Sequence, residues 1–228
     1  MSTRQYRASL LVSLIAIFAS LHTILGLVPG IWRRWIIAIE PLEGIILGPI
    51  GGFLSALVGS LISNFIRPTL YFFRLGEPIG ALTAGLAYKG KYYIVLAIYT
   101  VMLVAYFIHP LGRELPAWCL WDIYIAYAFS TVSPLILKFF EKKEREVKLF
   151  LATLLGLEVD VLTRIFFLIP IELYKVLGVS KEALVGWWIV GAFETPVETA
   201  IGLFVTLVVG IPLLATLDKS KLVKYPIT

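Results

Sequence analysis

Residues 40–64, EPLEGIILGPIGGFLSALVGSLISN, contain the pattern that decides the fold. The stretch is apolar, and two carboxylates, Glu40 and Glu43, stand at its head. Small residues recur three or four positions apart along it, and on a helix they form one stripe that lets another backbone approach closely. The members of this stripe are Gly48, Gly52, Ala56, Gly59 and Ser63. The stretch therefore predicts a tightly packed membrane helix that opens on charged groups.

The composition of the chain is that of an integral membrane protein. Hydrophobic residues make up 59% of the 228 residues, charged residues make up only 15%, and the mean hydropathy is +0.90. This is more apolar than an ordinary soluble domain. Runs of about twenty residues with few charges recur along the chain, and each is long enough to cross a hydrocarbon core as a helix. The sequence lacks the short alternating segments of a membrane barrel.

Apolar segments divide the chain and predict its fold. They fall at about 8–28, 43–65, 78–88, 92–108, 118–138, 148–170 and 185–216. All are long enough to span a bilayer except 78–88, and the first is expected to stay uncleaved because it has no small-x-small cleavage site. We predict an all-α membrane protein, a bundle of six transmembrane helices plus a short re-entrant or interfacial helix near 78–88, in a single domain over residues 1–228. Seven spans are the alternative, because a short helix covered by protein can lie at membrane depth.

The distribution of Lys and Arg predicts the orientation. If 78–88 does not cross and the N terminus is cytoplasmic, most basic residues fall on the inner side, as the positive-inside rule requires. The inner group is Arg4, Arg7, Arg67, Arg74, Lys89, Lys91, Lys138, Lys142, Lys143, Arg145, Lys148, Lys219, Lys221 and Lys224, and the outer group is Arg33, Arg34, Arg113, Lys175 and Lys181. We expect a multi-pass protein of the plasma membrane with both termini in the cytoplasm.

Ionisable residues inside the last two apolar segments indicate a polar site, because charged groups in a membrane need a partner, a cavity or water. Asp160 and Arg164 lie four residues apart on one helical face and can pair. Glu194 and Glu198 share a stripe with Trp187 on the final segment. Counted at ~1.5 Å per residue from the predicted outer ends, these charged groups lie at overlapping depths. They predict a pocket that opens to the outside.

Residues from the first part of the chain are expected to complete this pocket. His22 lies at a similar depth, and Glu40 and Glu43 lie near the outer boundary, where we expect them to form the rim of the pocket. The predicted substrate-binding residues are therefore His22, Glu40, Glu43, Asp160, Arg164, Trp187, Glu194 and Glu198. Acids outnumber bases in this group, so either some acids are protonated or a cation or polar ligand completes the set. Alternatively, Asp160 and Arg164 only neutralise each other.

Tryptophans gather near the predicted outer boundaries, where indole rings commonly anchor helices at the headgroups. They are Trp32, Trp35, Trp118, Trp121, Trp187 and Trp188. Trp187 and Trp188 can also stack on a heteroaromatic or cationic ring.

A second stripe of small residues runs along the first apolar segment, about opposite His22. Ser9, Ser13, Ala16 and Ser20 advance by three or four residues. Such a stripe is either an internal packing seam or a docking surface for another membrane subunit. The predicted partner-docking residues are Ser13, Ala16 and Ser20.

The sequence contains no recognisable catalytic motif. A glycine-rich phosphate loop followed by Lys-Ser or Lys-Thr is absent, so the chain is not expected to hydrolyse ATP. The two histidines form no H-E-x-x-H pattern, and a serine nucleophile elbow is absent. We therefore expect no enzymatic activity, no cofactor and no metal site. The net charge of +5 is attributed to orientation and contact with the lipid bilayer, and no nucleic-acid partner is expected.

Two stretches together resemble the substrate-binding S component of an energy-coupling factor (ECF) vitamin transporter. They are SLIAIFASLHTILGLVPG and, after an outer loop, EPLEGIILGPIGGFLSALVGSLISN with its LGPIGG turn. About the first ninety residues match that layout. The resemblance implies a six-helix protein that captures a vitamin or related micronutrient and associates with a transmembrane coupling subunit and two cytoplasmic ATPase subunits. In that family an alanine pair four residues apart contacts the coupling subunit, and Ala16 and Ser20 have that spacing here.

The ligand and the functional class stay open at this point. The excess of carboxylates favours a cationic or donor-rich ligand, such as a thiamine-like compound, because ionised carboxylates only accept hydrogen bonds. A neutral or anionic ligand centred on Arg164 is the competing expectation. The alternative function is a proton- or cation-coupled secondary transporter that uses Glu194, Glu198 and Asp160 as a relay. An intramembrane enzyme with an acid pair is the least favoured class.

Overall fold

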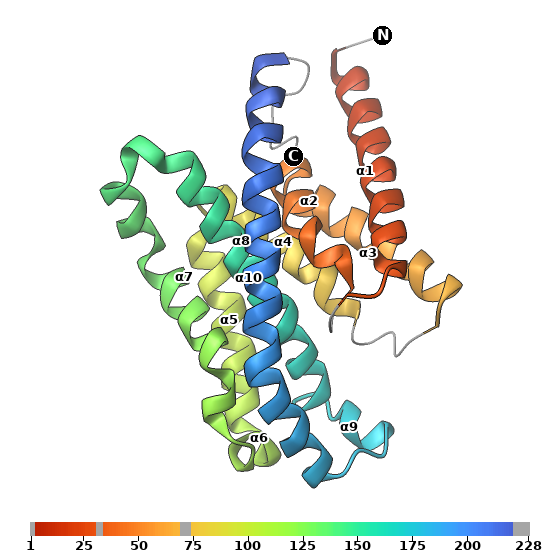
Figure 1. The fold of residues 1–228 in the computed structure, drawn as a ribbon, viewed down its shortest axis with the longest axis vertical. Helices are drawn as coiled ribbons and strands as arrows, with labels where there is room; N and C mark the ends of the chain where they lie inside the picture. The colour runs from red at the N-terminus through yellow and green to blue at the C-terminus, as the bar shows by residue number, and fades with distance from the viewer. Residues whose placement is uncertain (1–2, 31–33, 69–73, 221–228) are drawn as a thin grey trace.

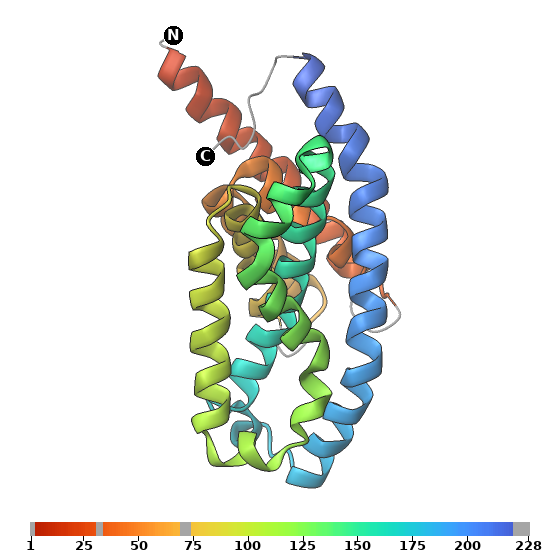
Figure 2. The same cartoon turned by 90° about the vertical axis from the view of Figure 1, so that its left-hand side faces the viewer.

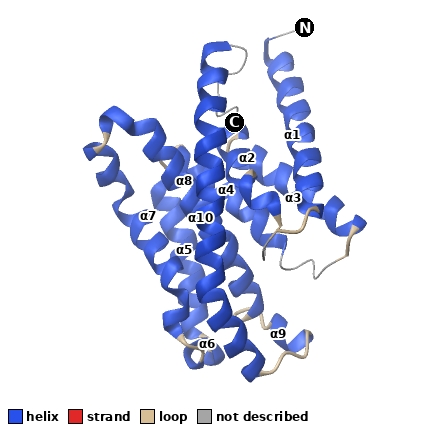
Figure 3. Cartoon of the chain, in the orientation of Figure 1, coloured by secondary structure: helices blue, strands red, loops and turns tan. Residues whose placement is uncertain are grey.

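The computed structural model describes residues 3–30, 34–68 and 74–220. The predictions for Trp32, Arg33, Lys221 and Lys224 lie outside these residues. Helices make up about 89% of the structure, and the part of the chain that is described contains no strand (Figure 3). The predicted all-α class is therefore confirmed.

Figure 1 shows the helices in chain order. They are α1 (Thr3–Leu27), η1 (Trp35–Ala38), α2 (Glu40–Leu47), α3 (Pro49–Ile66), α4 (Gly76–Tyr88), α5 (Tyr92–Ile108), α6 (Pro110–Glu114), η3 (Ala117–Leu120), α7 (Trp121–Phe139), η4 (Glu141–Lys143), α8 (Glu144–Leu168), α9 (Leu173–Val176) and α10 (Lys181–Ser220). Among the described residues, four stretches are long and apolar enough to cross a membrane, namely Ser9–Leu27, Pro49–Ile66, Ala117–Phe139 and Lys181–Lys219. The structure thus supports a membrane-embedded bundle, while the count of six or seven spans stays a prediction.

The segment predicted as one span over 43–65 is two helices. Gly48 separates α2 from α3 with φ +84° and ψ 170°, a conformation that essentially only glycine adopts. Pro49 begins α3, and a proline disfavours the helical conformation of the residue before it. The expectation of a continuous helix is therefore wrong at Gly48. The remaining small residues of the stripe, Gly52, Ala56, Gly59 and Ser63, are buried on α3.

The break changes the direction of the chain, because α3 runs parallel to α1. A Cβ on Gly51 would lie 3.6 Å from Leu11, near the start of α1, whereas a Cβ on Gly59 would lie 2.7 Å from the Cγ of His22, near its end. The C-terminal ends of the two helices therefore lie close together.

Two basic residues lie where α1 and α3 end. Arg74 donates to the carbonyl of Gly26 at 3.0 Å, and Arg67 donates to the carbonyl of Leu27 at 3.4 Å. Arg67 and Arg74 thus lie with Arg34, which we expected on the outer side. The prediction that Arg67 and Arg74 lie on the opposite side of the membrane from Arg34 is therefore wrong, because it assumed a single crossing between residues 43 and 65. Helix α1 begins and α10 ends at one end of the bundle, and α6 and α9 lie at the other (Figures 1 and 2).

Helix α4 lies in the middle of the fold. Its bounds, Gly76–Tyr88, match the short segment that the sequence predicts, but ten of its 13 residues are buried, so it is not an interfacial helix. It packs most extensively on α8 and also on α3 and α2. Glycines allow this close packing: a Cβ on Gly80 would lie 2.9 Å from the carbonyl oxygen of Gly156, and one on Gly44 would lie 2.8 Å from the amide nitrogen of Gly85. Protein, rather than lipid or water, covers this short helix.

We expect Gly44→Ala to destabilise the fold, because the new methyl group would meet the backbone of α4, which cannot move aside as a side chain can. The expected loss is about 1–3 kcal/mol, which lowers the melting temperature by roughly 3–10 °C. Thermal unfolding of the purified protein in detergent measures the change. Gly186→Ala on α10 is the matched control, because a Cβ there meets nothing within 4 Å. Equal melting temperatures for the two variants would contradict the close α2–α4 contact.

Candidate functional site

A buried hydrogen-bond network surrounds His22 of α1. Its Nδ1 lies 2.9 Å from the Oε1 of Glu43, and its Nε2 lies 2.9 Å from the Oγ of Ser60 and 3.1 Å from the Oε2 of Glu77. Ser60 also donates a hydrogen bond to Glu77. Both ring nitrogens of His22 thus face a carboxylate, and only the imidazolium form can donate to both carboxylates at once. The network joins α1, α2, α3 and α4.

Short helices place the two carboxylates of this network. Glu43 lies in the first turn of α2 and Glu77 in the first turn of α4, where the helix dipole stabilises negative charge. Each helix opens on a Glu-Pro pair, Glu40-Pro41 in α2 and Glu77-Pro78 in α4, and proline suits the first helical positions. Glu77 was not among the predicted site residues, although this repeated Glu-Pro pair was a visible signal.

Arg164 of α8 extends the network towards the other half of the bundle. Its Nε and Nη2 donate to the two carboxylate oxygens of Asp160 at 3.0 and 2.8 Å, as the four-residue spacing predicts. Its Nη2 also lies 3.9 Å from the Oε1 of Glu77. Glu77 therefore connects the His22 network to the Asp160–Arg164 pair.

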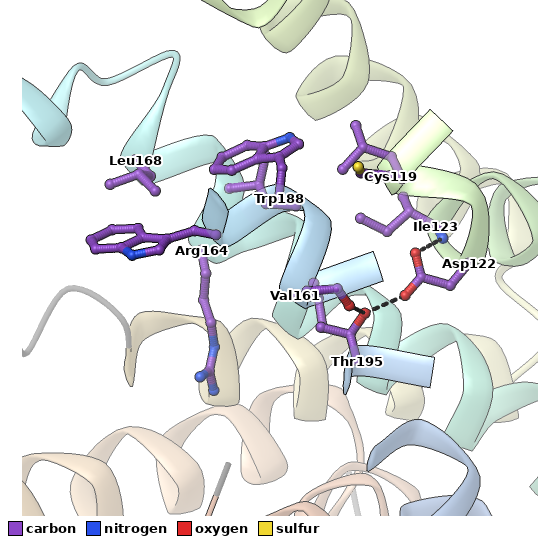
Figure 4. Close-up of a pocket in the computed structure, with 12 residues that line it drawn as sticks. Cys119, Asp122, Ile123, Val161, Arg164, Leu168, Trp188 and Thr195 are labelled. Atoms are coloured by element: carbon purple, nitrogen blue, oxygen red, sulfur yellow. Dashed lines mark hydrogen bonds between the residues drawn. The ribbon is translucent and has the colours of Figure 1, made fainter. Parts of the chain in front are cut away.

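A cavity of about 250 Å³ lies beside Arg164 (Figure 4). It is enclosed by η3, the start of α7, the second half of α8 and the first half of α10. Its lining residues are Cys119, Leu120, Asp122, Ile123, Val161, Arg164, Ile165, Leu168, Trp187, Trp188, Gly191 and Thr195. The walls are mainly apolar and aromatic, with a few polar groups, which is the usual chemistry of a small-molecule site.

The aromatic and acidic groups of the cavity are held in place. Trp188 is buried, donates its indole N–H to the hydroxyl of Tyr106 at 3.0 Å, and stacks on that ring with 6.3 Å between centroids. Asp122 accepts hydrogen bonds from the backbone N–H of Ile123 at 2.9 Å and from the hydroxyl of Thr195. These contacts fix the shape of the cavity before any ligand enters.

The predicted site residues fall into three groups in the structure. Arg164 and Trp187 line the cavity. Asp160 does not line it but accepts a hydrogen bond from Arg164. Among the described residues, the contacts that link His22 and Glu43 to the cavity run through Glu77, which lies 3.9 Å from Arg164. The third group, Glu40, Glu194 and Glu198, does not line the cavity.

The exposed fractions of Glu40 and Glu43 contradict their predicted position. Glu40 and Glu43 are both 0% exposed, so their expected position on an outer rim is wrong. They are buried because the break at Gly48 turns α2 into the protein interior. Glu198 is buried and Glu194 is half-buried on α10, and a binding role for these two residues stays a prediction.

Several polar residues of the site were missed by sequence reasoning. Ser60 is not among the residues of the predicted stripe, Arg74 is predicted only as a charge on the inner side, and Asp122 and Thr195 belong to no motif. Only the parallel course of α1 and α3 brings Ser60 and Arg74 to His22 and Glu77. Among the described residues, no group of three or more His, Cys, Asp and Glu side chains could hold a metal ion.

The small-residue stripe on α1 faces away from the bundle. Ser13, Ala16 and Ser20 are all exposed. The Ser13 hydroxyl donates to the carbonyl of Ser9 at 3.0 Å and that of Ser20 donates to Ala16 at 2.9 Å, so the stripe presents little polar surface. The alternative of an internal packing seam is therefore wrong, and partner docking stays a prediction.

No family model, curated protein or solved structure matches this chain. The class of the protein therefore rests on its own fold and site. They define a membrane-embedded helical protein with a buried ionic network and an adjoining, mainly apolar cavity.

His22→Leu is expected to lower the free energy of unfolding by about 3–5 kcal/mol, because it leaves Glu43 and Glu77 buried without their shared donor. The melting temperature of the detergent-purified protein should fall by roughly 10 °C.

His109→Leu is the matched control. His109 pairs with Glu172, whose pKa Lys175 and His109 hold below its usual range, but Glu172 is 44% exposed and water screens the pair. The melting temperature of His109→Leu should therefore change much less than that of His22→Leu. Equal effects of the two substitutions would contradict a structural role for the His22 network.

Proposed function

We propose that the protein is a membrane-embedded binding subunit that captures a small molecule, such as a vitamin or related micronutrient, for uptake. The observation that carries the proposal is the cavity lined by Trp187, Trp188 and Arg164. Its volume of about 250 Å³ suits a compound of one or two rings. The indoles supply stacking surfaces and Arg164 supplies a charged donor that can fix the orientation of a ligand.

Energy for uptake would come from partner subunits, as in ECF transporters. The sequence contains no ATP-binding phosphate loop. The exposed stripe of Ser13, Ala16 and Ser20 supports docking to a transmembrane coupling subunit, which two cytoplasmic ATPases would drive. In this arrangement the protein lies in the plasma membrane with both termini in the cytoplasm, and the end that carries α6 and α9 faces outward. With Arg67 and Arg74 moved to the outer group, the inner side still holds more basic residues.

A proton-coupled carrier is the second candidate function. The buried His22, Glu43 and Glu77 form a titratable chain that reaches the cavity through Arg164, which favours this class. Uptake into liposomes that contain only this chain and a proton gradient would support the carrier. Uptake that requires ATPase partners would support the binding subunit.

Filling the cavity should remove the ligand without unfolding the protein. A Cβ on Gly191 meets nothing within 4 Å, so Gly191→Phe can project into the cavity that Gly191 lines. We expect mass spectrometry to find a small molecule with the purified wild-type chain and roughly 10-fold less of it with Gly191→Phe.

Gly186→Phe is the matched control, because Gly186 lies on the same helix with open space around it and does not line the cavity. This variant should retain the ligand. The proposal fails if Gly191→Phe loses no compound that the wild type carries.

The docking surface can be tested apart from the cavity. Ala16→Trp should abolish uptake by cells that carry the partner subunits, because the large ring prevents close helix approach, while ligand binding by the purified chain stays unchanged. Val101→Trp on α5 is the control, since Val101 is 65% exposed but lies outside the stripe. Equal loss of uptake and of ligand binding in Ala16→Trp would argue against docking at this face.

A further inference from the structure

Arginines converge where α1 and α3 end. Arg34 and Arg74 both donate to the carbonyl of Gly26, the latter at 3.0 Å, and Arg74 also donates to the hydroxyl of Ser63. Arg67 donates to the carbonyl of Leu27 at 3.4 Å. All of these acceptors are neutral oxygens. Three guanidinium groups are therefore gathered around the last turn of α1 by uncharged partners.

Among the described residues, these three arginines form no direct ion pair with an acid. None of the ion pairs between described residues involves Arg34, Arg67 or Arg74. Residues 28–39 and 67–76 contain no Asp or Glu, so the nearest acids in the sequence are Glu40 and Glu77, which directly follow these stretches. Arg74 is only 4% exposed, and a buried charge without a counter-ion is strongly unfavourable.

Glu77 is the carboxylate that acts on this cluster. Burial lowers the pKa of Arg34 and of Arg74, Glu77 partly offsets this effect on both, and the pKa of Arg74 is further lowered by Arg34 and Arg164. Glu77 is already engaged by His22 and Ser60. Asp160 is engaged by both arms of Arg164. The site therefore has an excess of positive charge.

The excess can be counted from the groups that face one another. Among the described residues whose mutual contacts or electrostatic effects are given above, four cations, Arg34, Arg67, Arg74 and Arg164, stand against two acids, Glu77 and Asp160, while His22 and Glu43 neutralise each other when His22 is protonated. Two positive charges are therefore in excess. A carboxylate, with one negative charge, would reduce this excess, and a doubly ionised phosphate group would remove it.

Arg164 connects this cluster with the cavity. Its side chain lines the cavity, and in Figure 4 its guanidinium extends away from Trp188. That head lies within 3.9 Å of Glu77 and in electrostatic range of Arg74. A ligand that fills the indole-lined cavity can therefore place an acidic group at the arginines.

We propose that Arg34, Arg74 and Arg164 form an anion-binding site, which holds the carboxylate or phosphate group of a ligand whose ring lies in the cavity. This inference rests on the function proposed above and names the class of its ligand. The planar fork of guanidinium groups matches the two oxygens of these anions. It replaces the expectation of a cationic ligand, because Glu194 and Glu198, on which that expectation depended, do not line the cavity.

Capping of the last turn of α1 does not by itself explain the three arginines. Arginines can satisfy the last carbonyls of a helix, and Arg67, which is exposed, does so for Leu27. Capping does not require a buried Arg74 without a counter-ion. A phospholipid phosphate has the same chemistry as a ligand phosphate, and the experiment must therefore separate these sources.

The first test identifies the charge of the ligand. The compounds that copurify with the wild-type chain and are lost from Gly191→Phe should carry a carboxylate or a phosphate, as shown by mass spectrometry. If the lost compounds are neutral or cationic, the anion site is wrong although the binding function stands. If no compound is lost, the proposed function and this inference both fail. If the only anion is a phospholipid that Gly191→Phe retains, the cluster is a lipid site and the inference is wrong.

The second test uses inorganic phosphate as the probe, with the protein in nanodiscs of zwitterionic lipid. At constant ionic strength, phosphate should raise the melting temperature of the wild-type chain by a few degrees relative to chloride. Arg74→Gln and the less buried Arg34→Gln should abolish the shift, and Arg74→Lys should retain only part of it, because lysine keeps the charge but lacks the fork.

Arg113→Gln is the matched control, since Arg113 is an exposed arginine of α6, which lies at the same end of the bundle as α9 and far from α1 in both views (Figures 1 and 2). It should leave the phosphate shift unchanged. The proposal is overturned if phosphate shifts the melting temperatures of Arg34→Gln and Arg74→Gln as much as that of the wild type, or if it does not shift that of the wild type. Because Arg34→Gln removes only a half-buried side chain, its result stands even if Arg74→Gln fails to fold.

Discussion

The hydrogen bonds of His22 are the interaction on which the first half of the structure depends. One imidazole contacts side chains from α2, α3 and α4 at the same point in the interior. Buried carboxylates are stable only when they are paired and hydrogen-bonded, so these helices cannot move apart without leaving a charge unsatisfied. The contact between Glu77 and Arg164 then ties this half to α8 and to the cavity.

Glycine packing makes this network geometrically possible. Helix α4 reaches the interior because its backbone approaches those of α2 and α8 at Gly44, Gly80 and Gly156, where a side chain would not fit. The left-handed conformation of Gly48 ends α2 and lets α3 run parallel to α1. Small residues thus supply close contact and a change of direction, and the ionic network fixes the resulting arrangement. In a membrane interior, where apolar burial does not distinguish protein from lipid, both contributions are needed.

The same arrangement links the proposed binding site to the rest of the molecule. Arg164 belongs to the cavity wall, pairs with Asp160 and lies 3.9 Å from Glu77, so a ligand that engages it acts on a group shared by both halves of the bundle. The opposite face of α1, which carries Ser13, Ala16 and Ser20, is exposed where a partner helix can approach. A binding subunit needs these two surfaces, one for the ligand and one for the partner.

The sequence by itself determined the helical class, the positions of most helices and the Asp160–Arg164 pair, because these depend on apolar runs and on spacing within one helix. The segments 78–88 and 92–108 match α4 and α5 within two residues. Tertiary structure alone decided that residues 40–66 reverse at Gly48, that Arg67 and Arg74 join Arg34, and that Glu43 and Glu77 meet His22. The Gly48-Pro49 pair permits the reversal but does not dictate its direction. The other outcomes depend on contacts between residues far apart in the sequence, such as those of His22 with residues 21 and 55 positions away, which no local pattern encodes.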